Sequence, residues 1–152
     1  ILPTTRETLE SKVAKAVAQA KKTVLVVDDE PAILEILEQF FVFERFRPVL
    51  AQSYDEAVAI LEKEPVDIAV SDVMLDGKTG FDLLQFIKRT YPHIPVILAT
   101  GYSRRIGSKD LQAMGADGLI AKPFKNTELI YTLRDCLLRY EDKPRVKPPA
   151  SA

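Results

Sequence analysis

Short runs of apolar residues alternate along the chain with longer segments in which apolar positions recur every three or four residues. Three of the short runs are continuous and mostly β-branched, which is typical of strands buried on both faces of a parallel sheet. The runs lie at 23–27, 48–51, 68–71, 96–99 and 118–121. We therefore expect a parallel sheet built from these five segments.

A helical pattern follows each run. Pro31 suits the first turn of a helix that reaches Phe41. Ser53 and Glu56 match a capping box ahead of the second helix. Three more helices are predicted at 81–90, at about 104–114 and at 127–140, the last with Asn126 as its N-cap. Alternating strands and helices favour an α/β domain with helices on both faces of the sheet.

The two ends of the chain differ from this pattern. In residues 1–22 a narrow apolar stripe recurs at helical spacing, and such a helix needs a partner to be stable in water. The stripe consists of Leu9, Val13, Ala16, Val17 and Ala20. Residues 141–152 hold three prolines and one large apolar residue, Val146. We predict a helical linker at 1–22, a globular domain at 23–140 and a disordered tail at 141–152.

Composition narrows the class of protein. The chain has 21 basic and 22 acidic residues, and this balance argues against nucleic acid as a partner. Cys136 is the only cysteine, so no intramolecular disulfide is possible and a reducing, cytoplasmic setting fits best. No apolar run approaches the ~18 residues of a membrane span, so we expect no membrane contact by this segment.

Polar residues stand where the predicted strands end. Asp28 and Asp29 follow the first strand, Asp72 the third, Thr100 the fourth and Lys122 the fifth. Ligands of such sheets bind beyond the carboxyl ends of the strands. Carboxylates that converge there need a neutralising cation, and oxygen ligands without histidine or cysteine suit magnesium.

This set of residues matches phosphoryl transfer to a carboxylate, in which the protein positions the reactants and neutralises charge. Asp72 would be the nucleophile and phosphoacceptor. Asp29 would bind Mg2+, assisted by Asp28 through a water molecule. Lys122 and Thr100 would each bind one phosphoryl oxygen, and the same metal would assist later hydrolysis.

The segments VLVVDDE, SDVMLDGKTG, PVILATG and AKPF, in this order and spacing, resemble the signature of receiver domains of two-component response regulators. The resemblance covers 23–140. It implies a flavodoxin-like (βα)5 fold with strand order 2-1-3-4-5 and a cis peptide before Pro123. It also implies a magnesium site of Asp29, Asp72 and the backbone carbonyl of Met74, with magnesium-dependent self-phosphorylation and autodephosphorylation. The donor would be a phosphohistidine on a histidine kinase or a histidine phosphotransfer protein, docking near the first helix.

Two positions depart from the family pattern. Asp76 stands where the family usually has proline, and Leu119 where it usually has an aromatic residue. Asp76 would either tighten cation binding or slow an anionic donor. We expect a conformational switch that involves Thr100 and Leu119, with Tyr102 in place of the missing aromatic residue.

The context of the domain stays open between three versions: a single-domain regulator, a regulator separated from its output domain, and the carboxy-terminal receiver of a hybrid histidine kinase. The start ILPTT resembles the end of a histidine-kinase ATP-binding domain, which favours the hybrid kinase. The helix at 1–22 would then be a linker that packs on the receiver or pairs with a second copy in a homodimer.

Two rival functions remain. Asp76 and Leu119 favour a degenerate receiver that binds partners without phosphoryl chemistry, whereas the intact Asp29, Asp72 and Lys122 oppose it. A magnesium phosphohydrolase with an aspartyl nucleophile would need a second aspartate two residues after Asp72. That position holds Met74, which argues against a phosphohydrolase.

Overall fold

A parallel five-stranded sheet lies at the centre of the computed structural model, which describes residues 21–101 and 115–141. The strand order is β2-β1-β3-β4-β5, so the flavodoxin-like order is confirmed. Each observed strand agrees with its predicted run to within one residue at each end. The strands are β1 (Thr23–Val27), β2 (Arg47–Ala51), β3 (Ile68–Asp72), β4 (Val96–Thr100) and β5 (Gly118–Ala121).

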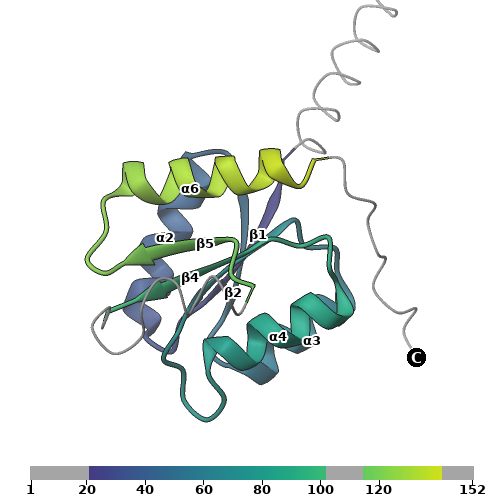
Figure 1. Ribbon diagram of the computed structural model, residues 1–152. Helices are drawn as coiled ribbons and strands as arrows, with labels where there is room; N and C mark the ends of the chain where they lie inside the picture. The colour runs from purple at the N-terminus through teal and green to yellow at the C-terminus, as the bar shows by residue number, and fades with distance from the viewer. Residues whose placement is uncertain (1–20, 102–114, 142–152) are drawn as a thin grey trace, which may run out of the picture.

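Helices cover both faces of this sheet, with α2 and α6 on one side and α3 and α4 on the other (Figure 1). Their bounds are α2 (Pro31–Phe43), α3 (Tyr54–Lys63), α4 (Gly80–Thr90) and α6 (Asn126–Arg139). The predicted helix at about 104–114 lies outside the described residues. The same holds for the predicted linker at 1–22 and tail at 141–152, apart from their innermost residues.

The strands form two apolar cores because their side chains alternate between the two faces of the sheet. In β1, Leu25 and Val27 pack towards α3 and α4, while Val24 and Val26 pack towards α2 and α6. All of β1 is buried. Each fully buried side chain of this size stabilises the fold by about 1.5–3 kcal/mol. Burial on both faces explains why the sequence shows continuous apolar runs rather than an alternating pattern.

The start of α3 is held by part of the predicted capping box. Ser53 is the N-cap, and its hydroxyl accepts a hydrogen bond from the backbone N–H of Glu56 at 3.2 Å. The Glu56 carboxylate, however, accepts from the backbone N–H of Gln52 at 3.3 Å. The Ser53 half of the box is therefore confirmed. A complete capping box forms instead at α4, between Thr79 and Asp82.

The predicted cap of the last helix was wrong. Lys125 is the N-cap of α6 and Asn126 is the first helical residue. Lys125 has the extended backbone that a cap position requires, with φ −85° and ψ 149°, and no side chain caps the helix. Residue type alone favoured Asn126, but the path of the chain after β5 determines where helical dihedral angles begin.

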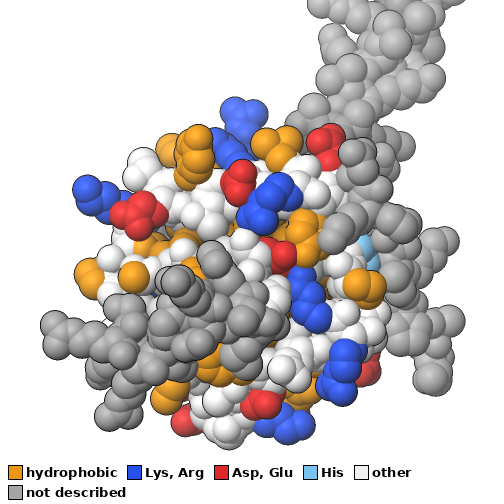
Figure 2. Space-filling view, in the orientation of Figure 1, with side chains coloured by type: hydrophobic (Ala, Val, Ile, Leu, Met, Phe, Trp, Pro, Cys, Tyr) orange, Lys and Arg blue, Asp and Glu red, His pale blue; other side chains and the backbone are white. Residues whose placement is uncertain are grey.

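The surface has mixed charge. Figure 2 shows acidic and basic side chains interspersed on one face of the molecule, without a continuous basic patch there. Among residues 21–101 and 115–141, no helix combines the length and apolar character needed to cross a bilayer.

Candidate functional site

Three carboxylates meet at the carboxyl end of the sheet. Strands β1 and β3 are hydrogen-bonded neighbours, so residues that follow β1 lie beside the last residue of β3. Asp28 and Asp29 come directly after β1, and Asp72 ends β3. Carboxylate oxygens of the three residues all lie within 4.8 Å of one another. The predicted convergence of these side chains at one edge of the sheet is therefore confirmed.

Asp28 is the buried member of this group, with 2% of its surface exposed. One carboxylate oxygen, Oδ1, accepts a hydrogen bond from the backbone N–H of Glu30 at 2.9 Å. The other, Oδ2, lies 3.1 Å from Nζ of Lys122. A buried carboxylate is costly unless it is hydrogen-bonded and paired, and Asp28 is both.

Lys122 joins the acidic residues from the opposite side of the site. Its Nζ lies 3.1 Å from Oδ2 of Asp28 and 3.1 Å from Oδ2 of Asp72. The backbone N–H of Lys122 donates to the carbonyl of Thr100 at 2.8 Å, which continues the pairing of β5 with β4. The Lys122–Pro123 peptide is cis, as the family resemblance implied.

The site carries excess negative charge. Burial and the charges of Asp28, Asp76 and Asp72 together raise the pKa of Asp29. For Lys122, burial alone would lower the pKa, but hydrogen bonds to Asp72 and Asp28 outweigh it and the pKa is raised. The lysine is therefore an ammonium at neutral pH. Three carboxylates against one ammonium leave two uncompensated negative charges, which a divalent cation matches.

Gly80, the first residue of α4, packs directly against the backbone of Asp72. A Cβ placed on Gly80 would lie 2.3 Å from the carbonyl oxygen of Asp72 and 3.0 Å from Cα of Val73. The N–H of Gly80 also donates to the carbonyl of Val73 at 2.9 Å. The sequence suggested only a loop-ending role for Gly80. Its proximity to Asp72 was missed because it depends on how the β3–α4 loop closes.

The other predicted site residues lie around this centre. The backbone N–H of Met74 donates to Oδ1 of Asp72 at 3.1 Å, and its side chain is 64% exposed. Thr100 is half-buried at the end of β4. Leu119 lies within β5 and packs against the apolar core on the α3 and α4 side. Tyr102 lies outside the described residues.

Comparison with known proteins shows one consistent family. Residues 24–134 match the family model of the response regulator receiver domain. The chain is 39% identical over 116 residues to the heme response regulator HssR of Staphylococcus aureus (strain Newman), covering 76% of this chain and 51% of that protein. It is 35% identical over 118 residues to HssR of Staphylococcus saprophyticus, with 78% and 52% covered. The chain thus spans about half the length of these curated relatives.

Solved structures give the same result. A CheY-like response regulator receiver domain protein from Methanospirillum hungatei JF-1 superposes with a TM-score of 0.76 at 30% identity, covering 82% of this chain and all of that one. The response regulator protein TrrA of Thermotoga maritima, solved in complex with Mg2+ and BeF, superposes with a TM-score of 0.69 at 29% identity. That superposition covers 76% of this chain and 98% of TrrA.

Proposed function

Because this chain belongs to the response regulator receiver domain family of two-component signalling, we propose that it accepts a phosphoryl group on Asp72 from a phosphohistidine donor. The observation that carries the proposal is the position of Lys122, whose ammonium contacts both Asp28 and Asp72 within the cluster of three carboxylates. That arrangement places a partly buried carboxylate nucleophile beside a fixed positive charge.

We propose Mg2+ as the cofactor. Asp29, Asp72 and the backbone carbonyl of Met74 would bind the ion, and Asp28 would reach it through water. The donor set supports this assignment, since it contains only oxygen atoms and carries two uncompensated negative charges. When bound, the ion neutralises charge on the carboxylates and on the phosphoryl oxygens.

The chain's own residues would then carry out the transfer. A carboxylate oxygen of Asp72 attacks phosphorus, a P–O bond forms, and the P–N bond to the donor imidazole breaks. Lys122 would exchange its contact with Asp72 for one phosphoryl oxygen while keeping its contact with Asp28. The Thr100 hydroxyl would donate to another phosphoryl oxygen. Attack by water on phosphorus of the aspartyl phosphate would then break the P–O bond to Asp72, release inorganic phosphate and regenerate the carboxylate.

The donor protein would dock on α2. This helix begins directly beyond the acidic residues, at Pro31. Ile36 and Phe43, which are 62% and 83% exposed, lie seven residues apart and thus on one side of the helix. Exposed apolar side chains on a helix that begins at the acidic site are suited to binding another protein.

A mass measurement tests the proposal. The chain is incubated with Mg2+ and acetyl phosphate, and its intact mass is compared with that of Asp72→Asn. We expect a gain of one phosphoryl group in the wild type and none in Asp72→Asn. Asp135→Asn, which removes an exposed carboxylate on α6, is the matched control and should gain mass like the wild type. A wild type that gains no mass would contradict the proposal and favour the alternative of a receiver used only as a binding module.

The context of the domain, among the three versions given above, stays a prediction. The relatives extend well beyond the matched region, and the hybrid-kinase context is favoured only by the segment ILPTT. The switch through Thr100, Leu119 and Tyr102 and the boundaries at 23 and 140 are likewise predictions.

A further inference from the structure

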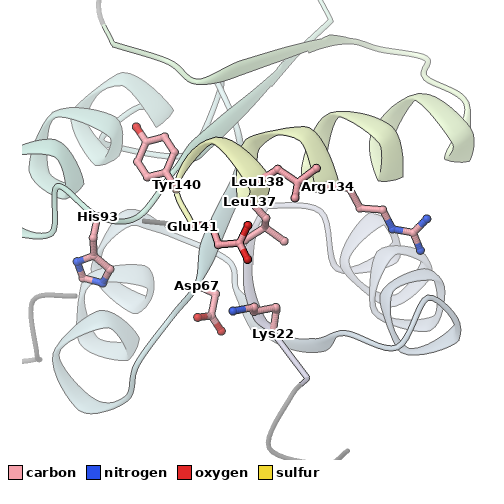
Figure 3. Close-up of a pocket in the computed structure, with 8 residues that line it drawn as sticks. All are labelled: Lys22, Asp67, His93, Arg134, Leu137, Leu138, Tyr140 and Glu141. Carbon is pink, nitrogen blue, oxygen red and sulfur yellow. The ribbon is translucent and has the colours of Figure 1, made fainter. Parts of the chain in front are cut away.

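A hollow lies at the opposite end of the sheet from the acidic site. It is a pocket of about 390 Å³ (Figure 3). Residues that precede β1, β3 and β4 line it together with the end of α6, so it lies at the amino-terminal end of the strands. The lining that matters here is Lys22, Asp67, His93, Leu137, Leu138 and Glu141.

One wall of this pocket is apolar and exposed. Leu137 and Leu138 project from the last turns of α6, and Leu138 is 69% exposed. Figure 3 shows Leu137 and Glu141 above Asp67 and Lys22, with His93 to one side. An apolar wall with a charged rim is the arrangement expected of a surface that binds an amphipathic segment.

The wall is also held rigidly. The Tyr140 hydroxyl donates to Asp117, and Nζ of Lys88 lies 2.7 Å from the same hydroxyl. Asp117 in turn accepts from the backbone N–H of Val96 at 2.8 Å. These contacts fix the end of α6 to α4 and to the start of β4, so the pocket is preformed.

We propose that residues 9–20 of this same chain bind in this pocket. Lys22 is part of the pocket wall, so the segment enters the domain at the binding surface itself. Val17 precedes Lys22 by five residues, and five residues span at most about 18 Å even when fully extended, so Val17 can reach the pocket. The stripe described above requires an apolar partner, and its small side chains suit a shallow pocket.

Composition favours this occupant over the other end of the chain. The segment has five apolar residues at helical spacing, which can cover the exposed side chain of Leu138. Residues 142–152 also begin at this rim. They contain three prolines and a single large apolar residue, so they offer no apolar stripe to cover Leu138.

Hydrogen exchange of the full chain, read by mass spectrometry, tests the proposal. In the wild type, amides of residues 9–20 should exchange at least about tenfold more slowly than in an unstructured chain. Leu138→Asp and Val17→Asp should each abolish this protection. Tyr131→Asp is the matched control, because Tyr131 is 79% exposed on the same helix but does not line this pocket. It should leave the protection unchanged.

Three results would overturn the inference. Residues 9–20 could exchange at the unstructured rate in the wild type, or Tyr131→Asp could remove the protection as fully as Leu138→Asp. Protection that disappears on dilution would instead identify a second copy as the partner. Phosphorylation by acetyl phosphate, measured on the same samples, should be equal in all variants. A failure of this inference is thereby distinguished from a failure of the proposed function.

Discussion

At the scale of single residues, substitutions can separate the contribution of Lys122 to stability from that of the carboxylates around it. Lys122 is the only ion-pair partner recorded for Asp28 and for Asp72 among the described residues. Its removal would leave a carboxylate that is 2% exposed without a counterion. Loss of the Asp72 charge has the opposite effect, because it relieves repulsion within the cluster.

We therefore predict stability changes of opposite sign. In urea without divalent cations, Lys122→Met should lower the free energy of unfolding by about 2 kcal/mol. Asp72→Asn should raise it by about 1 kcal/mol. Two changes of the same sign would show that repulsion does not dominate the cluster. Lys125→Met, at the cap of α6 and outside the recorded ion pairs, is the control and should be nearly neutral.

Burial of Cys136 predicts that the stability of the protein depends on pH. Burial raises the pKa of the Cys136 thiol to about 11, although the nearby Arg139 opposes the shift. The protonated thiol thus stabilises the folded state. That contribution is fully present below the ordinary thiol pKa of about 8.5 and is lost as the pH rises towards 11.

Stability should consequently fall more steeply between pH 8.5 and 11 in the wild type than in Cys136→Ala, by roughly 2–3 kcal/mol over this range. Urea denaturation at a series of pH values measures the difference. Parallel curves for the two proteins would contradict the prediction, since every other titratable residue is common to both.

Some site residues could be predicted from sequence and others could not. Asp28, Asp29, Asp72 and Lys122 were identifiable because the carboxyl ends of parallel strands share one edge. The sequence could not show that Asp28 rather than Asp29 is buried, because this depends on the path of the chain into α2. Nor could it show that the Lys122 ammonium contacts two carboxylates at once.

At the scale of secondary structure elements, the β3–α4 connection positions the proposed nucleophile. Gly80 packs directly against the carbonyl of Asp72, and the Thr79–Asp82 capping box fixes the start of α4. Any side chain at position 80 must displace backbone atoms. Such a shift moves the Asp72 carboxylate relative to Lys122 and Asp28.

Gly80→Ala should destabilise the protein by about 2 kcal/mol and slow phosphorylation by acetyl phosphate at least about tenfold. Gly101→Ala is the control, because a Cβ on Gly101 would meet nothing within 4 Å among the described residues. Thermal unfolding and the rate of mass gain measure the two effects. Equal behaviour of the two alanine variants would show that the close approach of Gly80 is not required.

Strands were easier to predict than helix ends. Buried strands carry a strong apolar signal, so all five predicted runs match to within one residue at each end. Helix ends depend on local hydrogen bonds that compete with one another. The carboxylate of Glu56 accepts from the backbone N–H of Gln52 rather than from that of Ser53, and α6 starts after Lys125. Neither choice is fixed by residue type alone.

At the scale of the whole molecule, metal binding should be linked to folding. An ion that binds only the folded state stabilises it by about 1.4 kcal/mol at ten times its dissociation constant, which corresponds to a rise of about 4 °C in Tm. We predict that Mg2+ raises the Tm of the wild type and that EDTA reverses the effect.

Asp29→Asn should lose most of this rise, because it removes a proposed ligand. Asp55→Asn, on the first turn of α3, should retain it. A rise of equal size in both variants would place the bound cation elsewhere on the molecule. Differential scanning fluorimetry over a Mg2+ titration measures these shifts.

The order of the strands was predictable only through the family resemblance. Hydrophobic patterns indicated five strands and helices on both faces, but several strand orders satisfy the right-handed crossover rule. Four motifs at strand ends selected one of them. The sequence could not reveal the pocket near Leu138, because the residues that line it come from four distant segments.

Lys22 and Glu141, near the first and the last of the described residues, both line that pocket. These two ends of the described chain therefore lie on the same side of the domain, opposite the acidic site. A folded unit attached at either end would not shield Asp72 from an approaching donor. A fold with this geometry can be inserted into longer polypeptides at little steric cost.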